Sequence, residues 1–426
     1  RWHTDHPHTD MNHAPSLLHR RTSGVLLHIT SLPGPHGSGD LGPGARHFVD
    51  WLAAAGQTLW QILPLSPAGP GNSPYQSVSA FAGSPLMVDL DDLVQQGWLP
   101  WMARKGFDEH RCDFARVAPY RMACLRKAWD GFSQRATDVC REALAAFCAE
   151  QAHWLDHYAL FMVLDERHGG PWSLWPEPLA RREPAALDAV REQSVHALGF
   201  WRFVQWRFWV QWQGLRSYAR ERGVQMVGDA PIFVAHHSAD VWAHADQFLL
   251  DEQMEPAVVA GVPPDYFSAT GQRWGNPLYN WEAMAHRGYR WWKDRLAHLF
   301  QQVDVVRLDH FRGFEAHWEI PASEPTAVAG QWQPGPGLAF FKAIEDELGQ
   351  LPIIAEDLGL ITPEVTARRD KKQNCTHLHD MAVLAAAGGP MQRCEPEAFL
   401  RDESSAHDRA CPDHPDGARA DPGSGL

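Results

Sequence analysis

The chain has 426 residues, 44% of them hydrophobic, which is enough for one large α/β barrel or for two or three smaller domains. Its 52 acidic residues exceed its 38 basic residues and give a formal charge of −14. This balance argues against nucleic acid or an anionic membrane surface as the main partner, because both are bound through basic patches. No apolar run reaches the roughly 18 residues of a membrane span, so no membrane contact is expected.

The seven cysteines form no CxxC pair and follow no regular spacing, so they indicate neither a zinc site nor a disulfide framework. A reducing, cytoplasmic compartment is the simpler interpretation. The first twenty residues lack the apolar segment of a secretory signal, and we expect residues 1–20 to be an unstructured extension. Because the first methionine is Met11, we interpret this extension as translated upstream sequence or the edge of a fragment. Its histidines (His3, His6, His8) could bind a metal, but a disordered tail is the favoured interpretation.

The first ordered segment reads as a strand, a helix and a second strand. Residues 24–29 are apolar and predict a strand, and a turn-rich loop follows. Residues 44–55 predict a short amphipathic helix with Trp51 in its apolar face, and residues 59–65 predict the second strand. This order with short connections is typical of a parallel α/β sheet.

Residues 90–222 interrupt this order and have a largely helical pattern. From Leu144 onward, apolar residues recur at three- and four-residue steps, which indicates an amphipathic helix. Four tryptophans further along sit near helical spacing, as buried helix positions do: Trp201, Trp206, Trp209 and Trp212. We interpret the region as an insertion between barrel strands, because alternating strands and helices resume after it.

After the insertion, three apolar segments each end in a carboxylate: Asp229, Asp309 and Glu356. One such residue is weak evidence, because an Asp after a strand often caps the next helix. Three carboxylates at the same position after their strands predict a shared site at the carboxyl ends of parallel strands, where the active sites of α/β barrels lie. The segment 261–277 is rich in Gly and Pro and predicts a long functional loop without regular structure. Helices are predicted over 283–300 and 338–349, and strands over 224–233, 303–308 and 352–357.

Two carboxyl groups that face one cleft, with no metal motif nearby, suggest glycosidic bond chemistry. A retaining mechanism needs a nucleophilic carboxylate and a second carboxyl group about 5–5.5 Å away as acid and base. Asp309 suits the nucleophile, because Arg307 lies two residues earlier on the same strand face and is expected to hold it ionised. Glu356 suits the acid/base, since apolar neighbours at a barrel rim favour a protonated carboxyl group. A plain ion pair of Arg307 with Asp309 is the structural alternative.

Six ordered motifs then become recognisable, and they span about residues 24 to 365. They read HITSLPGPHGSGDLG at 28–42, SPYQSVSAFAGSP at 73–85, GDAPIFVAHHSADVW at 228–242, VVAGVPPDYFSATGQRWGNPLY at 258–279, VVRLDHFRGFEAHWEIP at 305–321 and IIAEDLGLITPEV at 353–365. With these motifs the chain resembles the 4-alpha-glucanotransferases (amylomaltases, or disproportionating enzymes) of glycoside hydrolase family 77.

The resemblance implies a TIM (β/α)8-type barrel over residues 21–365, with the helical insertion after its second strand. It implies an enzyme that cleaves an α-1,4-glucan, holds the glucosyl segment covalently and passes it to the 4-hydroxyl of another glucan. It makes Asp309 the nucleophile and Glu356 the acid/base. It also implies no metal, no organic cofactor, and α-1,4-glucans or maltooligosaccharides as partners. The implied substrate-binding residues are Tyr75, Asp229, Asp265, Gln272, Trp274, Arg307 and His310, with the 261–276 loop over the cleft.

The sequence departs from the family pattern after Val365. Members of the family carry a third catalytic Asp in a Thr-His-Asp-Asn motif, and this chain has no such motif. Asp380 follows Glu356 too closely to fill the role, and no apolar strand precedes Asp408. We expect residues 366–426 to be an aberrant, frameshifted and disordered tail, which leaves the barrel truncated. A barrel missing about three strands has an open edge, so poor folding and absent turnover are expected.

Two alternative functions stay open from the sequence. The first is an α-retaining glucan hydrolase on the same barrel, in which water resolves the covalent intermediate. The second is a catalytically dead fragment that binds glucans, because the third catalytic Asp is missing.

Overall fold

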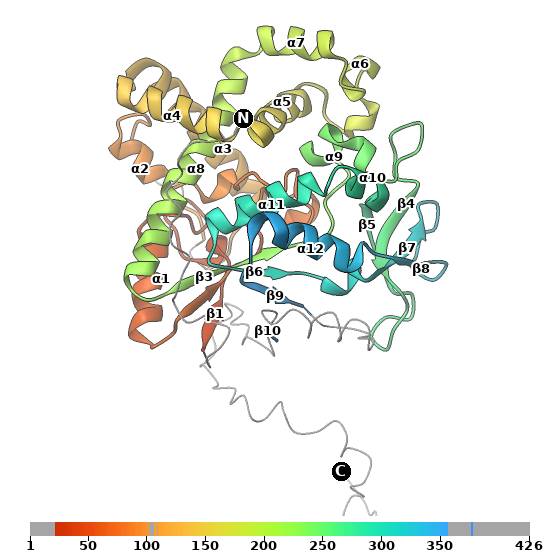
Figure 1. The fold of residues 1–426 in the computed structure, drawn as a ribbon. Helices are drawn as coiled ribbons and strands as arrows, with labels where there is room; N and C mark the ends of the chain where they lie inside the picture. Colours follow the sequence, from red (N-terminus) through yellow and green to blue (C-terminus); the bar gives the residue numbers. More distant parts are fainter. Residues whose placement is uncertain (1–21, 102–105, 109, 357–375, 378–426) are drawn as a thin grey trace, which may run out of the picture. The chain divides into compact units, whose positions relative to one another are not determined.

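The computed structural model describes residues 22–101, 106–108, 110–356 and 376–377, all within a compact unit that extends to Ala385. A parallel sheet forms its centre, with strand order β1-β2-β3-β6-β9-β10 (Figure 1). These strands are Gly24–Leu26 (β1), Leu59–Gln61 (β2), Gln225–Ala230 (β3), Val305–Leu308 (β6), Ile353–Ala355 (β9) and Thr376–His377 (β10). The first five of these strands fall within the predicted segments but are shorter, because only their central residues pair with neighbours. Strand β10 lies in the tail, where no strand was predicted.

Apolar side chains cover both faces of this sheet, as parallel sheets require. On one face, Leu59, Val227, Val305 and Ile354 pack together in a small cluster. Alternate residues of the same strands, among them Trp60 and Val306, join the main core on the other face. The alternation of strand side chains therefore gives β2, β3, β6 and β9 two buried surfaces.

Helices accompany the strands along the chain, as an α/β fold predicts. They are α1 (Pro43–Ala54), α9 (Ala239–Ala243), α10 (Trp281–His286), α11 (Arg290–Gln302) and α12 (Gly337–Leu348). Trp51 was expected in the buried face of α1, but that expectation is wrong: Trp51 is 36% exposed. The single helix predicted over 283–300 is also wrong, because Gly288 and Tyr289 both adopt left-handed backbone angles that end α10.

The helices expected within 90–222 are present between β2 and β3. They are Leu90–Gln95 (α2), Phe114–Arg135 (α3), Asp138–Glu150 (α4), Ala152–His168 (α5), Glu177–Ala180 (α6), Pro184–Gln193 (α7) and Val195–Glu221 (α8). Short 3₁₀ turns lie at Ile29–Ser31, Pro70–Asn72, Pro85–Met87, Trp172–Leu174, Ala245–Gln247 (η6) and Phe311–Phe314. Figure 1 shows the longer insertion helices gathered on one side of the sheet.

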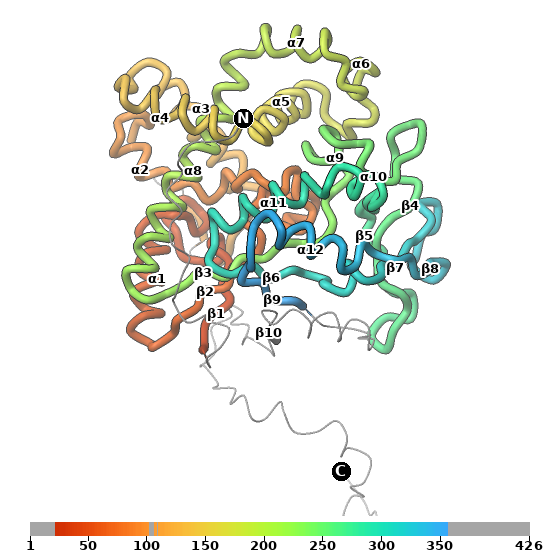
Figure 2. Tube along the Cα trace, in the orientation of Figure 1, coloured from red at the N-terminus to blue at the C-terminus, as the bar shows by residue number. Residues whose placement is uncertain are grey.

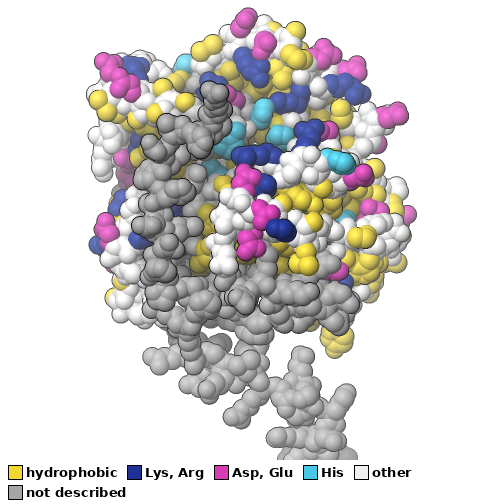
Figure 3. Space-filling view, viewed as in Figure 1, with side chains coloured by type: hydrophobic (Ala, Val, Ile, Leu, Met, Phe, Trp, Pro, Cys, Tyr) yellow, Lys and Arg dark blue, Asp and Glu magenta, His cyan; other side chains and the backbone are white. Residues whose placement is uncertain are grey.

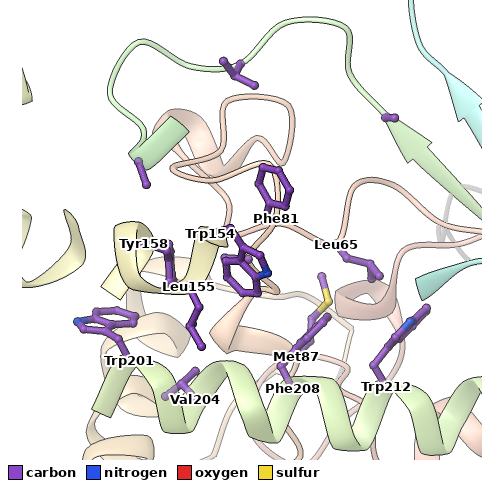
Figure 4. Close-up of a cluster of buried hydrophobic side chains, with 14 of the residues drawn as sticks. Leu65, Phe81, Met87, Trp154, Leu155, Tyr158, Trp201, Val204, Phe208 and Trp212 are labelled. Atoms are coloured by element: carbon purple, nitrogen blue, oxygen red, sulfur yellow. The ribbon is translucent and has the colours of Figure 1, made fainter. Parts of the chain in front are cut away.

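Helix α8 organises the core of the insertion. Trp201, Trp206 and Trp212 are buried, as their spacing predicts, whereas Trp209 is only partly buried against the core. Figure 4 shows side chains of α8 directed toward Trp154, Leu155 and Tyr158 of α5. The indole N–H of Trp212 also donates to the carbonyl oxygen of Gln302 at 2.9 Å. Through this bond α8 is joined to the end of α11, so the insertion packs against the βα units.

A second, antiparallel sheet replaces the loop that was expected over 261–277. Val258–Val262 (β4) and Gln272–Pro277 (β5) form a hairpin, and β4 pairs with Ala316–Pro321 (β7), which pairs with Gln331–Pro334 (β8). Figure 2 shows the hairpin beside β7 and β8. The prediction was wrong because the partner strand β7 lies far along the chain. Only the hairpin tip, 263–271, is a loop.

Several expectations concern residues outside the described ranges: the 1–20 extension, Asp380, Asp408 and almost all of the 366–426 tail. Within the tail segment, Thr376–His377 pairs in parallel with Ile354–Ala355. In the part of the sheet that the structure describes, β1 and β10 are edge strands. Among the described helices, none is long and apolar enough to cross a membrane.

Replacing Trp212 with Ala is expected to lower the free energy of unfolding by about 3–5 kcal/mol, because it leaves a cavity and an unpaired carbonyl. Urea unfolding followed by circular dichroism measures the loss. The control is Trp51→Ala, at a partly exposed site on α1, with an expected loss of ~1 kcal/mol or less. Equal losses in the two variants would contradict the central role of α8.

Candidate active site

The register of three neighbouring strands brings the predicted carboxylates together. Asp229 of β3 lies opposite Arg307 of β6, and Leu308 lies opposite Ala355 of β9. The backbone ladder continues one step further, because Asp309 N–H donates to Ala230 and Glu356 N–H donates to Leu308, each at 3.1 Å. Side chains alternate along a strand, so Asp229, Arg307 and Asp309 share one sheet face. This face carries the apolar cluster of Leu59, Val227, Val305 and Ile354 one layer earlier.

Arg307 links all three carboxylates, and we call these four residues the acid cluster. The Nη1 atom of Arg307 lies 2.7 Å from Asp229 and 2.9 Å from Asp309, and the Nη2 atom of Arg307 lies 2.8 Å from Glu356. Burial disfavours the guanidinium charge, but the carboxylates raise the pKa of Arg307 above its ordinary value. One permanent cation therefore stabilises three acids in a site with little solvent.

Tyr75 reaches the acid cluster from the loop that follows β2. Its hydroxyl group donates a 2.7 Å hydrogen bond to Asp229 Oδ2. Burial, with the charge of Asp229, raises the pKa of Tyr75, so its hydroxyl group keeps its proton. Burial also raises the pKa of Asp229 despite the bonds from Arg307 and Tyr75. Asp229 is thus held in place by two donors from two different segments.

The electrostatic expectation for Asp309 was wrong. Arg307 was expected to keep Asp309 ionised, but the pKa of Asp309 is raised to about 7. Burial is the largest cause, and the charges of Asp229 and Glu356 add to it, while Arg307 acts in the opposite direction. One guanidinium does not offset burial plus two neighbouring carboxylates.

His310 connects the acid cluster to the antiparallel sheet. Its backbone has left-handed angles (φ 50°, ψ 48°), and its N–H donates to Glu356 Oε2 at 2.6 Å. Burial lowers the pKa of the imidazole to about 4, so the ring is neutral near pH 7. The ring of Trp274 meets this imidazole edge-on, with centroids 4.9 Å apart. Gln272 in turn accepts a 3.0 Å hydrogen bond from the indole of Trp274.

Of the predicted site residues, Tyr75, Asp229, Arg307, Asp309, His310 and Glu356 meet in direct contact, and Trp274 and Gln272 continue the set along β5. Asp265 does not join them through its hydrogen bonds. It is exposed in the hairpin tip, where its carboxylate accepts the N–H groups of Phe267 and Ser268. Asp265 therefore shapes the tip, whose rings Tyr266 and Phe267 are 97% and 94% exposed.

Two further positioning residues were missed by the sequence reasoning. Gln76 donates to the carbonyl oxygen of Trp274 at 3.3 Å and to Asn276 Oδ1 at 3.0 Å. Asn276 then donates to the carbonyl oxygen of Val234 at 3.0 Å. These bonds join the Tyr75 loop, β5 and the segment after β3. Both residues lie inside the recognised motifs, which was the available signal, but their pairing across 200 positions was not visible.

Comparison with known proteins decides the family. The sequence model of the 4-alpha-glucanotransferases matches residues 27–403. A 4-alpha-glucanotransferase of Thermus thermophilus is 50% identical over 352 residues, which is 82% of this chain and 70% of the relative. The enzyme of the same name from Synechocystis sp. is 47% identical, covering 83% and 72%. The chain belongs to the 4-alpha-glucanotransferase family. The family match extends beyond Val365 into the segment that the sequence reasoning set apart.

Solved structures of amylomaltases agree with this membership. The amylomaltase from Streptococcus agalactiae, determined in complex with acarbose, is 38% identical with a TM-score of 0.79 and covers 83% of this chain and 72% of its own. The amylomaltase from Corynebacterium glutamicum is 19% identical with a TM-score of 0.65 over 84% of this chain and 50% of its own, and shows the shared fold alone.

Replacing Arg307 with Met is expected to lower the free energy of unfolding at pH 7 by about 3–5 kcal/mol, because it leaves buried carboxylates without their cation. The native pKa of Asp309 is about 7, above its unfolded value, so its contribution to stability is full below pH ~4 and lost as pH rises toward 7. Arg307 lowers the pKa values of Asp229 and Asp309, so both rise further without it. The deficit of the variant should therefore shrink toward about pH 4.5, measured by urea unfolding.

The matched control is Lys342→Met, which removes an exposed lysine that pairs with Asp346 on α12. Its effect should stay within ~0.5 kcal/mol at both pH values. A deficit of Arg307→Met that is constant with pH would show that the loss comes from packing and not from the carboxylates.

Proposed function

We propose that this chain is a 4-alpha-glucanotransferase that moves a segment of an α-1,4-glucan to the 4-hydroxyl of an acceptor glucan or glucose by a retaining double displacement. The observation that supports it most is the acid cluster, in which Asp309 and Glu356 both bond to the one guanidinium of Arg307. Two carboxyl groups this close suit a covalent mechanism, which needs a separation of about 5–5.5 Å. Family membership supplies the substrate class.

In the first step Asp309 acts as the nucleophile. Its carboxylate attacks the anomeric carbon, the bond to the leaving glucan oxygen breaks, and Glu356 gives its proton to that oxygen. In the second step Glu356 takes the proton of the acceptor 4-hydroxyl, whose oxygen attacks the anomeric carbon and releases Asp309. Each proton that Glu356 donates is thus recovered from the acceptor.

Substrate contacts follow from the surroundings of these two carboxylates. Tyr75, Asp229, Arg307 and His310 are proposed to bind the donor glucose, because their polar atoms lie around Asp309 and Glu356. Trp274 offers an aromatic face beside His310, which suits the apolar side of a sugar ring. Asp265, through the tip it shapes, and Gln272, through Trp274, are proposed to bind the acceptor side. The exposed rings of Tyr266 and Phe267 would then favour a sugar over water as acceptor.

We also infer that the six described parallel strands belong to a TIM-type barrel, which the amylomaltase resemblance supports. A cytoplasmic location is proposed, and it is supported by the described cysteines, none of which forms a disulfide with another described residue. The α-retaining hydrolase and the inactive glucan-binding fragment remain the alternatives, the latter because the chain has no Thr-His-Asp-Asn segment.

Incubation with maltotriose separates the three functions. Transfer yields glucose together with oligosaccharides longer than maltotriose, hydrolysis yields only shorter products, and an inactive fragment binds maltotriose in calorimetry without forming product. For the transferase, Asp309→Asn and Glu356→Gln should each lower the rate by ~10³-fold or more. Asp346→Asn, an exposed carboxylate on α12, is the matched control and should keep the rate.

The rate should also depend on pH through Asp309, which must lose its proton to attack. Because burial and two neighbouring acids raise the pKa of Asp309 to about 7, kcat/KM should fall as pH drops below about 7. An acid limb near pH 4, the ordinary range for Asp, would contradict this expectation. The measurement is the initial rate of glucose release from maltotriose in a constant-ionic-strength buffer series.

A further inference from the structure

A separate cavity lies between helices α5, α9 and α11. Its volume is about 250 Å³, and the loop after β2 and the turn η6 complete its walls. Figure 3 shows histidine side chains gathered beside Lys and Arg side chains on this part of the surface. The cavity shares no lining residue with the acid cluster or Tyr75. It is therefore a second concave site, with a chemistry of its own.

Aromatic rings form part of its wall. Phe81 from the loop after β2 stacks on Trp154 of α5, with centroids 6.1 Å apart and planes at 14°, and meets Trp291 of α11 edge-on. Figure 4 shows Phe81 and Trp154 next to each other. All three line the cavity and are otherwise buried, so their positions are fixed by packing. Rigid aromatic walls suit the C–H face of a sugar ring.

The acceptor groups of the cavity include a buried carboxylate. Asp240 of α9 is 5% exposed and accepts the backbone N–H of Ala80 at 2.7 Å. A carboxylate offers about four acceptor positions, which is more than the N–H of Ala80 and the indole of Trp291 occupy. Burial raises the pKa of Asp240 to about 6, while the hydrogen bond from Ala80 and the charge of Arg295 act in the opposite direction. Hydroxyl groups of a ligand would donate to the acceptor positions that remain.

The donor groups include neutral imidazoles. The guanidinium of Arg182 donates to His157 Nδ1 at 3.1 Å, so a neutral His157 carries its proton on Nε2. Burial first, then Arg182, lowers the pKa of His157 to about 4, which leaves it uncharged near pH 7. His244 lies edge-on to His157, and its pKa is lowered to about 4 by burial first, then by His157 and Arg182. His157 and His244 can therefore form hydrogen bonds to a ligand as uncharged groups.

The charged lining residues disfavour an ionic ligand of either sign. Asp240 and Asp294 line the cavity and repel an anion, while Arg287 and Arg290 repel a cation. Both arginines are already paired, Arg287 with Asp246, and Arg290 with Asp294 and Glu347. Within the described residues, no group of His, Cys, Asp or Glu side chains is arranged to hold a metal ion.

We propose that this cavity is a non-catalytic binding site for one neutral hexose ring, such as a terminal glucose unit. Hydroxyl groups both donate and accept, which matches a lining of Asp240, His157 and planar polar side chains between aromatic rings. The size fits a single ring rather than a chain segment. The proposal does not depend on glucan transfer, because it concerns binding alone.

The test titrates methyl α-D-glucoside and follows tryptophan fluorescence, since Trp154 and Trp291 line the cavity. It uses the full chain carrying Trp274→Ala, which removes the aromatic contact beside the acid cluster. We expect a saturable fluorescence change with a dissociation constant in the millimolar range. Adding Ala243→Phe, which fills the cavity from α9, should abolish the change. Adding Ala146→Phe at an exposed position of α4 should leave the change intact.

A second variant guards against misfolding of the filled cavity. His157→Leu removes one donor and should weaken binding at least tenfold at a temperature where circular dichroism shows the variant to be folded. The proposal is overturned if no saturable change occurs, or if the change survives both Ala243→Phe and His157→Leu. It is also overturned if inorganic phosphate, and not the glucoside, produces the change. Glucan transfer is assayed separately in the same preparations, with maltotriose. Its loss would bear on the proposed function only, because the binding titration contains no donor glucan.

Discussion

The bonds from Arg307 to Asp229, Asp309 and Glu356 are the constraint on which the site depends. Three carboxylates from three strands approach one another in a largely buried position, and without a cation their mutual repulsion would separate the strand ends. The apolar cluster beneath them keeps water away from their lower side and strengthens each attraction and repulsion. The charge and position of each of these four residues therefore depend on the other three.

Much of this set could be predicted from the sequence, because its signals are local. Asp309 and Glu356 directly follow apolar strands, and Arg307 lies two positions before Asp309, so periodicity placed them on one face. The direction of the Asp309 pKa could not be predicted in the same way. It depends on burial and on two carboxylates from other strands, and the pairing register that brings them close is not written in any one segment.

The difference between local signals and contacts with distant segments also explains the wrong predictions of the fold. The segment 261–277 looks like a loop because it contains Gly and Pro, but β4 gains its regular structure by pairing with β7 more than fifty residues later. Trp51 looks like a core residue by type, whereas the buried stripe of α1 is set by Ala45, Val49 and Leu52. By contrast, the tryptophans of α8 follow helical spacing over several turns, and that repetition was sufficient to predict the burial of three of the four.

The loop after β2 joins the two concave sites of the molecule. Near its middle, Tyr75 bonds to Asp229, and Gln76 bonds to the carbonyl oxygen of Trp274 in β5. A few residues later, Ala80 donates to Asp240 and Phe81 forms an aromatic wall of the second cavity. The loop has almost no regular structure, so these bonds to other segments fix its conformation. A displacement of Phe81 or Ala80 would be carried through a short stretch, in which Ser77 bonds to Ser79 and Val78 accepts from Ala239, to Tyr75. The position of the Tyr75 hydroxyl group is therefore sensitive to how α5 and α9 pack.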